Sequence, residues 1–125
     1  MSFVTSNIGK VIVSKINSTI TTYAVMAPQG AAFPYAVYDT LQSEHDEVKS
    51  GTWVDYVNVL IMIYDTTYAG TCTKANSVRD ILNRMSGTIS SVKVDSCNFV
   101  TESDDYDNDL RCYIKFCEYK FRIKI

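Results

Sequence analysis

The sequence lacks most of the residues and motifs from which catalytic and metal sites are built. It has a single histidine, His45, and no Cys-x-x-Cys pair that would supply closely spaced zinc ligands. It also has no glycine-rich nucleotide or phosphate loop and no Gly-x-Ser-x-Gly nucleophile motif. We therefore expect no cofactor, no metal site and no catalytic residue, and the sequence does not predict an enzyme.

Charge and hydropathy exclude further classes of protein. The formal net charge is −2, from 12 basic and 14 acidic residues, so the basic excess of a dedicated nucleic-acid binder is missing. No apolar run reaches the roughly 18 residues of a membrane span, and the first residues lack the features of a secretory signal. We expect no membrane partner. The four cysteines are expected to be free thiols in a reducing cytoplasm.

The chain does have enough apolar sequence for a core. Of its 125 residues, 46% are hydrophobic and 21% are charged, which is typical of a folded globular domain. We found no internal repeat and no low-complexity segment. We therefore expect a single domain over residues 1–125.

The longest dense apolar segment is Thr52 to Asp65, TWVDYVNVLIMIYD. Read as a strand, it has two apolar faces: Val57, Val59, Ile61 and Ile63 on one, and Tyr56, Leu60, Met62 and Tyr64 on the other. Such a strand lies in the middle of a sheet and is covered on both faces. A buried helix is the alternative, but the β-branched residues and polar flanks favour the strand.

Two other segments carry apolar residues at steps of three and four, the spacing of an amphipathic helix. The first runs from Ser6 to Thr22, with Ser6 as the expected N-cap. The second runs from about Thr71 to Met85. We expect Thr71 or Thr73 to cap its start and Ser86-Gly87 to end it.

The remaining apolar segments predict strands, at Tyr23–Met26, Tyr35–Ser43, Thr88–Val100 and Leu110–Ile125. Breaks in their alternation predict irregularities at Ser90-Ser91 and Asp95-Ser96, and a bulge near Phe116-Cys117. The alternative at the last position is that the strand leaves one surface of the sheet and joins a partner there. Two polar segments, Gln42–Gly51 and Glu102–Asp109, are expected to be a hairpin loop and an acidic turn. Short turns rather than helical crossovers join the strands. We therefore expect an α+β fold, a mainly antiparallel sheet with two helices packed on one side.

The acidic turn resembles a calcium loop only superficially. Asp105, Asp107 and Asp109 have the spacing that opens an EF-hand loop. Leu110 stands where that loop needs glycine, and Phe116 stands where it needs a bidentate glutamate. We interpret the segment as a solvated turn.

His45 lies among acidic residues, next to Glu44 and Asp46. A histidine beside a carboxylate can act as an acid–base pair. No nucleophile motif accompanies it, so we interpret it as a surface residue.

The most specific segment is Met26 to Asp39, MAPQGAAFPYAVYD. It resembles the signature of the small tail-completion proteins of long-tailed bacteriophages, also called tail-terminator or minor tail proteins. The matching residues are Pro28, Gly30, Pro34, Tyr35 and Val37. The order of expected elements also resembles that family over most of the chain.

This resemblance implies a structural virion protein rather than an enzyme. Members form a ring, usually a hexamer, at the head-proximal end of the tail, where the ring ends growth of the tail tube and joins it to the head and neck. The implied partners are further copies of the chain, the tail-tube protein and a head-completion or connector protein. DNA passes through the channel without sequence-specific binding. Assembly would take place in the host cytoplasm.

Neighbouring subunits of a ring meet through two different surfaces, and strand addition is one way to join them. The expected interface or channel residues are Glu44, His45, Glu102, Asp104, Asp105, Asp107, Asp109, Lys120 and Arg122. One hypothesis is that the acidic turn faces the channel, where like charge keeps DNA from adhering. A solvated turn is the alternative.

Two other functions are consistent with the sequence. The chain is alternatively another connector ring, such as an adaptor or head-completion protein, or a tail-tube subunit. A more distant alternative is a small ligand-binding or enzymatic α+β domain, which would need a concave pocket lined by convergent polar groups.

Overall fold

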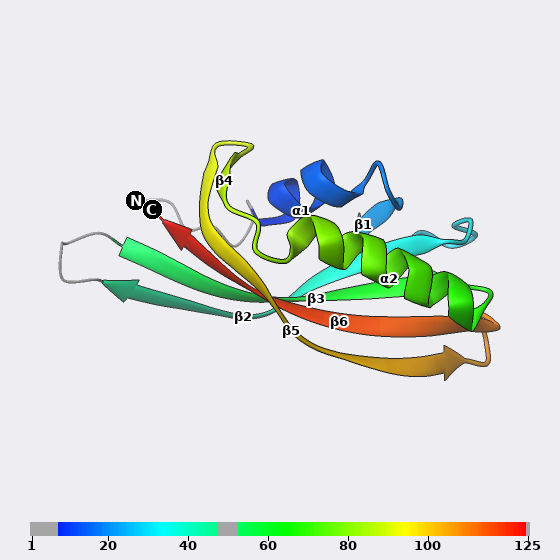
Figure 1. Ribbon diagram of the computed structural model, residues 1–125. Helices are drawn as coiled ribbons and strands as arrows, with labels where there is room; N and C mark the ends of the chain where they lie inside the picture. Colours follow the sequence, from blue (N-terminus) through cyan, green and yellow to red (C-terminus); the bar gives the residue numbers. More distant parts are fainter. Residues whose placement is uncertain (1–7, 48–52, 125) are drawn as a thin grey trace.

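The computed structural model describes residues 8–47 and 53–124, with the backbone alone for residues 42–47 and 53. Helices and strands follow one another as α1 Ile8–Ile16, β1 Thr22–Ala24, β2 Tyr35–Glu47, β3 Trp53–Asp65, α2 Tyr68–Leu82, β4 Gly87–Ile89, β5 Val92–Asp107 and β6 Cys112–Lys124 (Figure 1).

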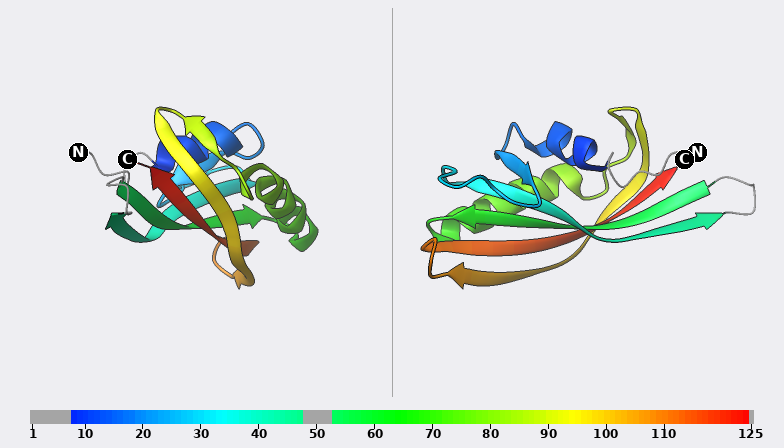
Figure 2. Two further views of the ribbon diagram at one scale, coloured as in Figure 1. Left: turned by 60° about the vertical axis from the view of Figure 1, so that its left-hand side comes forward. Right: turned by 180° about the vertical axis from the view of Figure 1, so that it is seen from behind.

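The strands form one sheet in the order β1-β2-β3-β6-β5-β4. The β1–β2 pair is parallel and every other pair is antiparallel. Both helices lie on the same side of the sheet, which twists strongly along its length (Figure 2). The prediction of an α+β fold with a mainly antiparallel sheet is therefore confirmed.

The central position predicted for the longest apolar strand is also confirmed, because β3 lies between β2 and β6. Its side chains Val57, Val59, Ile61 and Ile63 are fully buried in the core. The opposite face of β3 is only half-buried. The expectation that both faces are covered is therefore wrong. We call the side of the sheet that faces away from the helices the open face.

Helix α1 uses the predicted apolar stripe. Ile8, Val11, Ile12 and Ile16 are buried against the sheet. The helix ends at Ile16, earlier than expected, although Ile20 is still buried in the turn that follows. The predicted cap Ser6 lies outside the described residues.

Helix α2 begins earlier and ends earlier than predicted. Its N-cap is Thr67, whose hydroxyl accepts a hydrogen bond of 3.0 Å from the Gly70 N–H, so the expectation of Thr71 or Thr73 is wrong. Its C-cap is Asn83, and Arg84 follows with φ 66°. The Arg84 N–H donates to the Cys97 carbonyl at 2.7 Å, so contact with β5 ends the helix before Ser86-Gly87.

The two polar segments are mostly strand rather than turn. Strand β2 continues to Glu47, which pairs with Trp53, so the expected hairpin loop shrinks to residues 48–52, outside the described part of the chain. Residues 102–107 belong to β5 and pair with β6, and the turn lies at residues 108–111. Long partner strands extend these polar segments, because backbone pairing does not require apolar side chains.

The predicted irregularities lie partly elsewhere. Ser90 and Ser91, with φ 50° and 68°, form the tight turn between β4 and β5, and the sheet register shifts between Val94 and Ser96 as expected. The predicted bulge near Phe116-Cys117 is wrong, because β6 pairs with β3 without a register shift. The buried side of β6 changes within one regularly paired strand, from Cys112 and Ile114 to Cys117, Tyr119, Phe121 and Ile123.

Candidate functional site

The segment that carries the family signature connects β1 to β2 and begins with an unusual turn. Val25 has φ 62°, and the Met26 N–H donates to the Ala24 carbonyl at 2.6 Å. The Val25 N–H donates to the Tyr38 carbonyl at 2.8 Å, which anchors the turn to β2. Gly30 supplies a second positive φ, of 81°, and a cis peptide joins Phe33 to Pro34.

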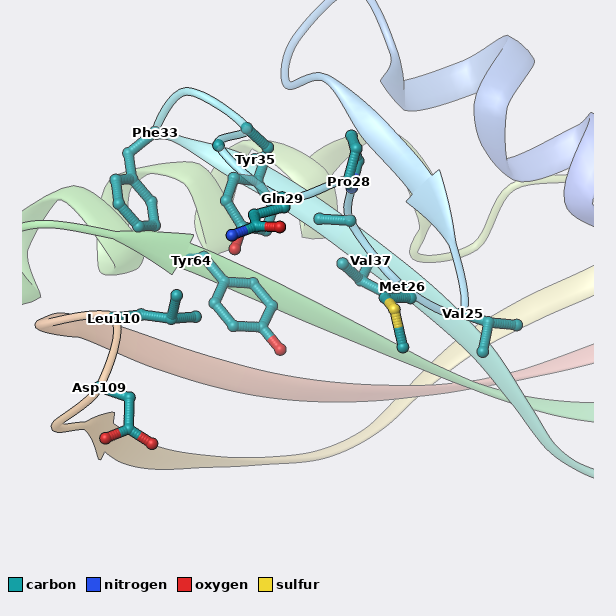
Figure 3. Close-up of a pocket in the computed structure, with 13 residues that line it drawn as sticks. Val25, Met26, Pro28, Gln29, Phe33, Tyr35, Val37, Tyr64, Asp109 and Leu110 are labelled. Atoms are coloured by element: carbon teal, nitrogen blue, oxygen red, sulfur yellow. The ribbon is translucent and has the colours of Figure 1, made fainter.

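This connection forms one wall of a groove on the open face (Figure 3). The groove has a volume of ≈ 550 Å³. Its lining residues are Val25, Met26, Ala27, Pro28, Gln29, Gly30, Ala31 and Phe33 from the connection, Tyr35, Val37 and Tyr64 from the sheet, and Asp109 and Leu110 from the β5–β6 turn. The structure thus brings Pro28, Gly30, Tyr35 and Val37 together, while Pro34 lies next to the lining residues in the chain.

Aromatic rings form the floor of the groove. The Tyr35 ring stacks on Phe33, with centroids 5.3 Å apart, and on Tyr64, with centroids 4.8 Å apart. Burial raises the pKa of both tyrosines, so their hydroxyls remain protonated and neutral at physiological pH. The floor therefore offers apolar surface with hydrogen-bonding hydroxyls and no group that is poised for catalysis.

The rim of the groove exposes apolar side chains to solvent. Val25 is 67% exposed, Met26 is 77% exposed and Leu110 is 48% exposed. Val25 is also a β-branched residue at positive φ, a conformation that costs free energy. Exposed apolar groups held by a strained turn are typical of a surface that contacts another protein.

The five carboxylates of the acidic segment do not form one cluster. In the β5–β6 pairing Asp104 lies opposite Lys115 and Asp105 lies opposite Ile114, so these two side chains project from opposite faces of the sheet. The Asp107 carboxylate accepts the Asp109 and Leu110 N–H groups at 2.9 and 3.0 Å and thereby stabilises the turn. Glu102, Asp105 and Asp109 are exposed.

The Asp104 carboxylate already has two side-chain partners in the same chain, Lys115 and Tyr68. Its carboxylate lies 2.6 Å from the Lys115 ammonium and accepts a hydrogen bond of 3.1 Å from the Tyr68 hydroxyl. The hydrogen bond from Lys115 lowers the pKa of Asp104. Burial opposes the charge of Lys115, but the Asp104 carboxylate outweighs it and raises the pKa of the lysine. This pair ties β5 and β6 to the start of α2.

The basic candidates lie on the open face at the far end of the sheet from the groove. The Lys120 ammonium lies 5.1 Å from the centroid of the Tyr56 ring, and the Arg122 guanidinium lies 6.0 Å from it. Arg122 also pairs with Asp95 at 2.5 Å. Glu44 and His45 lie on β2 opposite Tyr56 and Asp55, and their side chains are outside the described residues.

Within residues 8–47 and 53–124, no group of three or more histidine, cysteine or acidic side chains is placed to hold a metal ion. In the same part of the chain no helix is long and apolar enough to cross a membrane. The cysteines are free: Cys72 is half-buried, and Cys97, Cys112 and Cys117 are buried.

Residue patterns did not identify the apolar rim of the groove. Val25 and Leu110 have no distinguishing motif, and only the backbone conformation and the turn show that they are exposed beside Tyr64. One sequence feature does indicate the groove, because Tyr64 lies on the second apolar face of the central strand.

Comparison with known proteins gives one family and one fold. The family model "Tail completion protein gp17" matches residues 14–124. No curated protein matches the sequence. Among solved structures, 17 chains match. One belongs to "Virion of native gene transfer agent (GTA) particle", with a TM-score of 0.70, 13% identity, and coverage of 92% of this chain and 85% of that chain. At that identity the likeness concerns the fold.

Proposed function

The chain belongs to the tail completion protein gp17 family and is a structural protein of the phage virion tail, and from this premise we propose that it forms a ring at the head-proximal end of the tail. The ring ends growth of the tail tube and joins the tube to the head and neck. The observation that carries this proposal is the family match over residues 14–124.

The proposed partners follow from that position. They are further copies of the chain in a hexameric ring, the tail-tube protein and a head-completion or connector protein. DNA passes through the channel without sequence-specific binding, consistent with a net charge of −2. The chain acts as a single domain, without catalysis or a cofactor, and is assembled into virions in the host cytoplasm.

The groove supports a role in protein contact over the alternative of a small ligand-binding domain. A metabolite pocket needs a few convergent polar groups that fix the ligand. Here the floor is stacked aromatic rings and the rim is Val25, Met26 and Leu110, which are exposed apolar side chains. Polar groups also line the groove, from Gln29, Asp109 and the tyrosine hydroxyls, but the exposed apolar rim is the feature that favours a protein partner. Such surface is stabilised when a neighbouring virion protein covers it.

The proposal that the acidic segment faces the channel now concerns Asp105 and Asp109 on the side of the open face, because Glu102 projects from the same face as Asp104, opposite to Asp105. The Asp105 and Asp109 carboxylates are exposed, whereas Asp104 is held by Lys115 and Asp107 by the turn. Exposed negative charge along a channel keeps DNA from adhering to the wall.

Immunogold labelling of intact virions with an antibody against this chain tests the proposed position. We expect label at the junction between capsid and tail. Label along the whole tail would instead identify a tube subunit, and tails without label would contradict the structural role.

Loss of the chain separates a tail terminator from another connector ring. If the ring ends tube growth, particles assembled without the chain carry tubes of uncontrolled length. Tubes of normal length that fail to join heads would identify a head-completion ring instead.

A further inference from the structure

Two strand edges of the sheet are left open for a large part of their length. Strand β1 pairs with β2 only at Ala36–Tyr38, and β4 pairs with β5 only at Val92–Val94. Farther along β5, the Arg84 N–H and the Asn83 side chain bond the backbone of Cys97 and Phe99. No described strand pairs with the outer edge of Thr40–Glu47 or of Val100–Asp107.

Open edges of this kind present unpaired backbone N–H and C=O groups, which are templates for pairing with another chain. The two open stretches are equal in length, and they lie at opposite ends of the sheet (Figure 1). Building on the proposed ring, we propose that Val100–Asp107 of one copy pairs with Thr40–Glu47 of the next copy.

Strand direction supports this pairing. Strands β2, β3, β6 and β5 are joined by successive antiparallel pairs, so β5 runs antiparallel to β2. When copies repeat head to tail without reversal, β5 of one copy therefore meets β2 of the next in antiparallel orientation, and the alternation continues around the ring. The ends covered by β1 and β4 lie beyond the paired stretch, so neither short strand obstructs it.

The register that overlaps both stretches fully aligns Val100 with Glu47 and Asp107 with Thr40 of the next copy. Leu41 and Val100 are the extra residues of β-bulges in their own strands, because the register shifts between Thr40 and Gln42 and between Phe99 and Thr101. Between the two bulges the alignment is uninterrupted, and it places Glu102 opposite His45 and Asp105 opposite Gln42 of the next copy. No two acidic residues stand directly opposite each other, although both edges are acidic.

The pairing offsets neighbouring copies along the strands, because it joins one end of a sheet to the other end of the next. In a closed ring such an offset corresponds to strands that are tilted relative to the axis. The interface is therefore compatible with closure into a ring as well as with head-to-tail contact.

Engineered disulfides in assembled tails test this register. A chain carrying Gln42→Cys and Asp105→Cys places one new thiol on each edge at positions outside the bulges, and the proposed register makes them direct neighbours. After mild oxidation we expect a ladder of linked multimers on non-reducing gels. The matched control, Gln42→Cys with Thr101→Cys, uses the same two edges four residues out of register and is expected to remain unlinked.

A charge exchange tests the same contact independently. His45→Glu sets a carboxylate opposite Glu102 and is expected to reduce incorporation into virions several-fold. Adding Glu102→Lys to that variant creates an opposite-charge pair and is expected to recover incorporation. Asn76→Glu adds one negative charge to the exposed surface of α2 and should leave incorporation unchanged.

The outcomes separate this inference from the proposed function. If label lies at the head–tail junction but the Gln42/Asp105 pair does not link, or links no better than the control, the edge pairing is wrong and the ring stands. Label elsewhere on the virion contradicts both. Linkage without charge rescue would also overturn the register, because Glu102 and His45 are part of it.

Discussion

At the scale of single residues, two buried side-chain polar atoms have no hydrogen-bond partner among the described residues, Tyr119 Oη and Arg122 Nε, and the first of them lies in the core. Tyr119 is fully buried against Phe99, and its hydroxyl has no hydrogen-bond partner within the described part of the chain. Burial raises the pKa of this tyrosine, so the hydroxyl remains neutral. A buried hydroxyl without a partner costs free energy, which packing of the ring must offset.

We therefore expect Tyr119→Phe to raise the free energy of unfolding by about 1 kcal/mol. Denaturant unfolding of the purified protein measures this change. Tyr64→Phe, which alters a half-buried hydroxyl at the groove, serves as the comparison and should be nearly neutral. A loss of stability in Tyr119→Phe would mean that the hydroxyl is bonded, for example to an ordered water.

The Asp104–Lys115 pair predicts a stability change that depends on pH. Asp104→Asn leaves the buried Lys115 ammonium without its carboxylate, and since Asp104 itself is partly exposed we expect a loss of about 1–2 kcal/mol at pH 7. The pKa of Asp104 is lowered by folding, so its contribution is complete above the unfolded value of about 4 and is lost as pH falls through the lower folded value.

The measurement is the unfolding free energy of both proteins at neutral and acidic pH. The difference between wild type and Asp104→Asn should shrink below pH ~4, where the wild-type carboxylate becomes protonated. Asp105→Asn, one residue away on the opposite face, should show little difference at either pH. An undiminished effect of Asp104→Asn in acid would show that charge is not its cause.

At the scale of elements, Gly9 of α1 lies against a side chain of β2. A Cβ atom on Gly9 would overlap the ring and hydroxyl of Tyr38, and both residues also line a shallow hollow beside the helix. Glycine inside a helix is normally a disadvantage of roughly 1 kcal/mol relative to alanine. Here the Tyr38 side chain occupies the space that a larger residue at position 9 would need.

We expect Gly9→Ala to destabilise the protein by about 1–2 kcal/mol, because overpacking outweighs the gain in helix propensity. In a Tyr38→Leu background the overlap is relieved, so the same change should become stabilising. A double-mutant cycle by thermal or denaturant unfolding measures the coupling. Equal effects of Gly9→Ala in both backgrounds would contradict the proposed contact.

The ends of elements depend on contacts that lie far away in the sequence. Periodicity predicts both helices and the central strand, because a face buried in the core repeats regularly along an element. It does not predict that β2 continues to Glu47, since that polar stretch is a strand only because β3 is long enough to pair with it. Nor does it predict that Arg84 ends α2 by bonding Cys97.

At the scale of the whole molecule, one layer of helices covers one face of the sheet. The open face keeps half-buried Leu60 and Met62 and carries the groove with its exposed apolar rim. Exposed apolar surface of this kind is typical of a protein that contacts other subunits, and it is uncommon on a domain that acts alone. The structure of the free chain is therefore best understood as one component of an assembly.

The groove rim predicts a separation between stability and assembly. Met26→Gln changes a side chain that is 77% exposed, so we expect the unfolding free energy to change by no more than about 0.5 kcal/mol. Incorporation into virions should nevertheless fall, because a polar amide would then be buried in the contact. Met26→Leu, which keeps the side chain apolar, is the control and should be incorporated normally.

Quantitative blotting of purified particles against a capsid protein measures incorporation. Equal incorporation of Met26→Gln and Met26→Leu would show that the rim is not covered in the virion. A large loss of stability in Met26→Gln would instead place this side chain in the fold rather than in a contact.

Part of the candidate site could be anticipated from residues and part could not. The family signature includes Pro28, Gly30, Tyr35 and Val37, and the fold gathers them around one groove. Leu110 and Tyr64 complete that groove from distant parts of the chain, which no local pattern indicates. The acidic segment was expected to act as one turn, but pairing with β6 divides its carboxylates between two faces.

Local patterns along the chain are sufficient to predict the fold class, the helical and central-strand segments, the lack of catalytic and metal motifs, and the resemblance that the family match confirms. These properties depend on periodicity and composition, which can be read from neighbouring residues. Three other properties become visible only in the folded chain: which apolar face of β3 is covered, which strand edges stay open, and which carboxylate pairs with Lys115. Those outcomes depend on pairing between residues that are distant in sequence, where alternative partners have similar local chemistry.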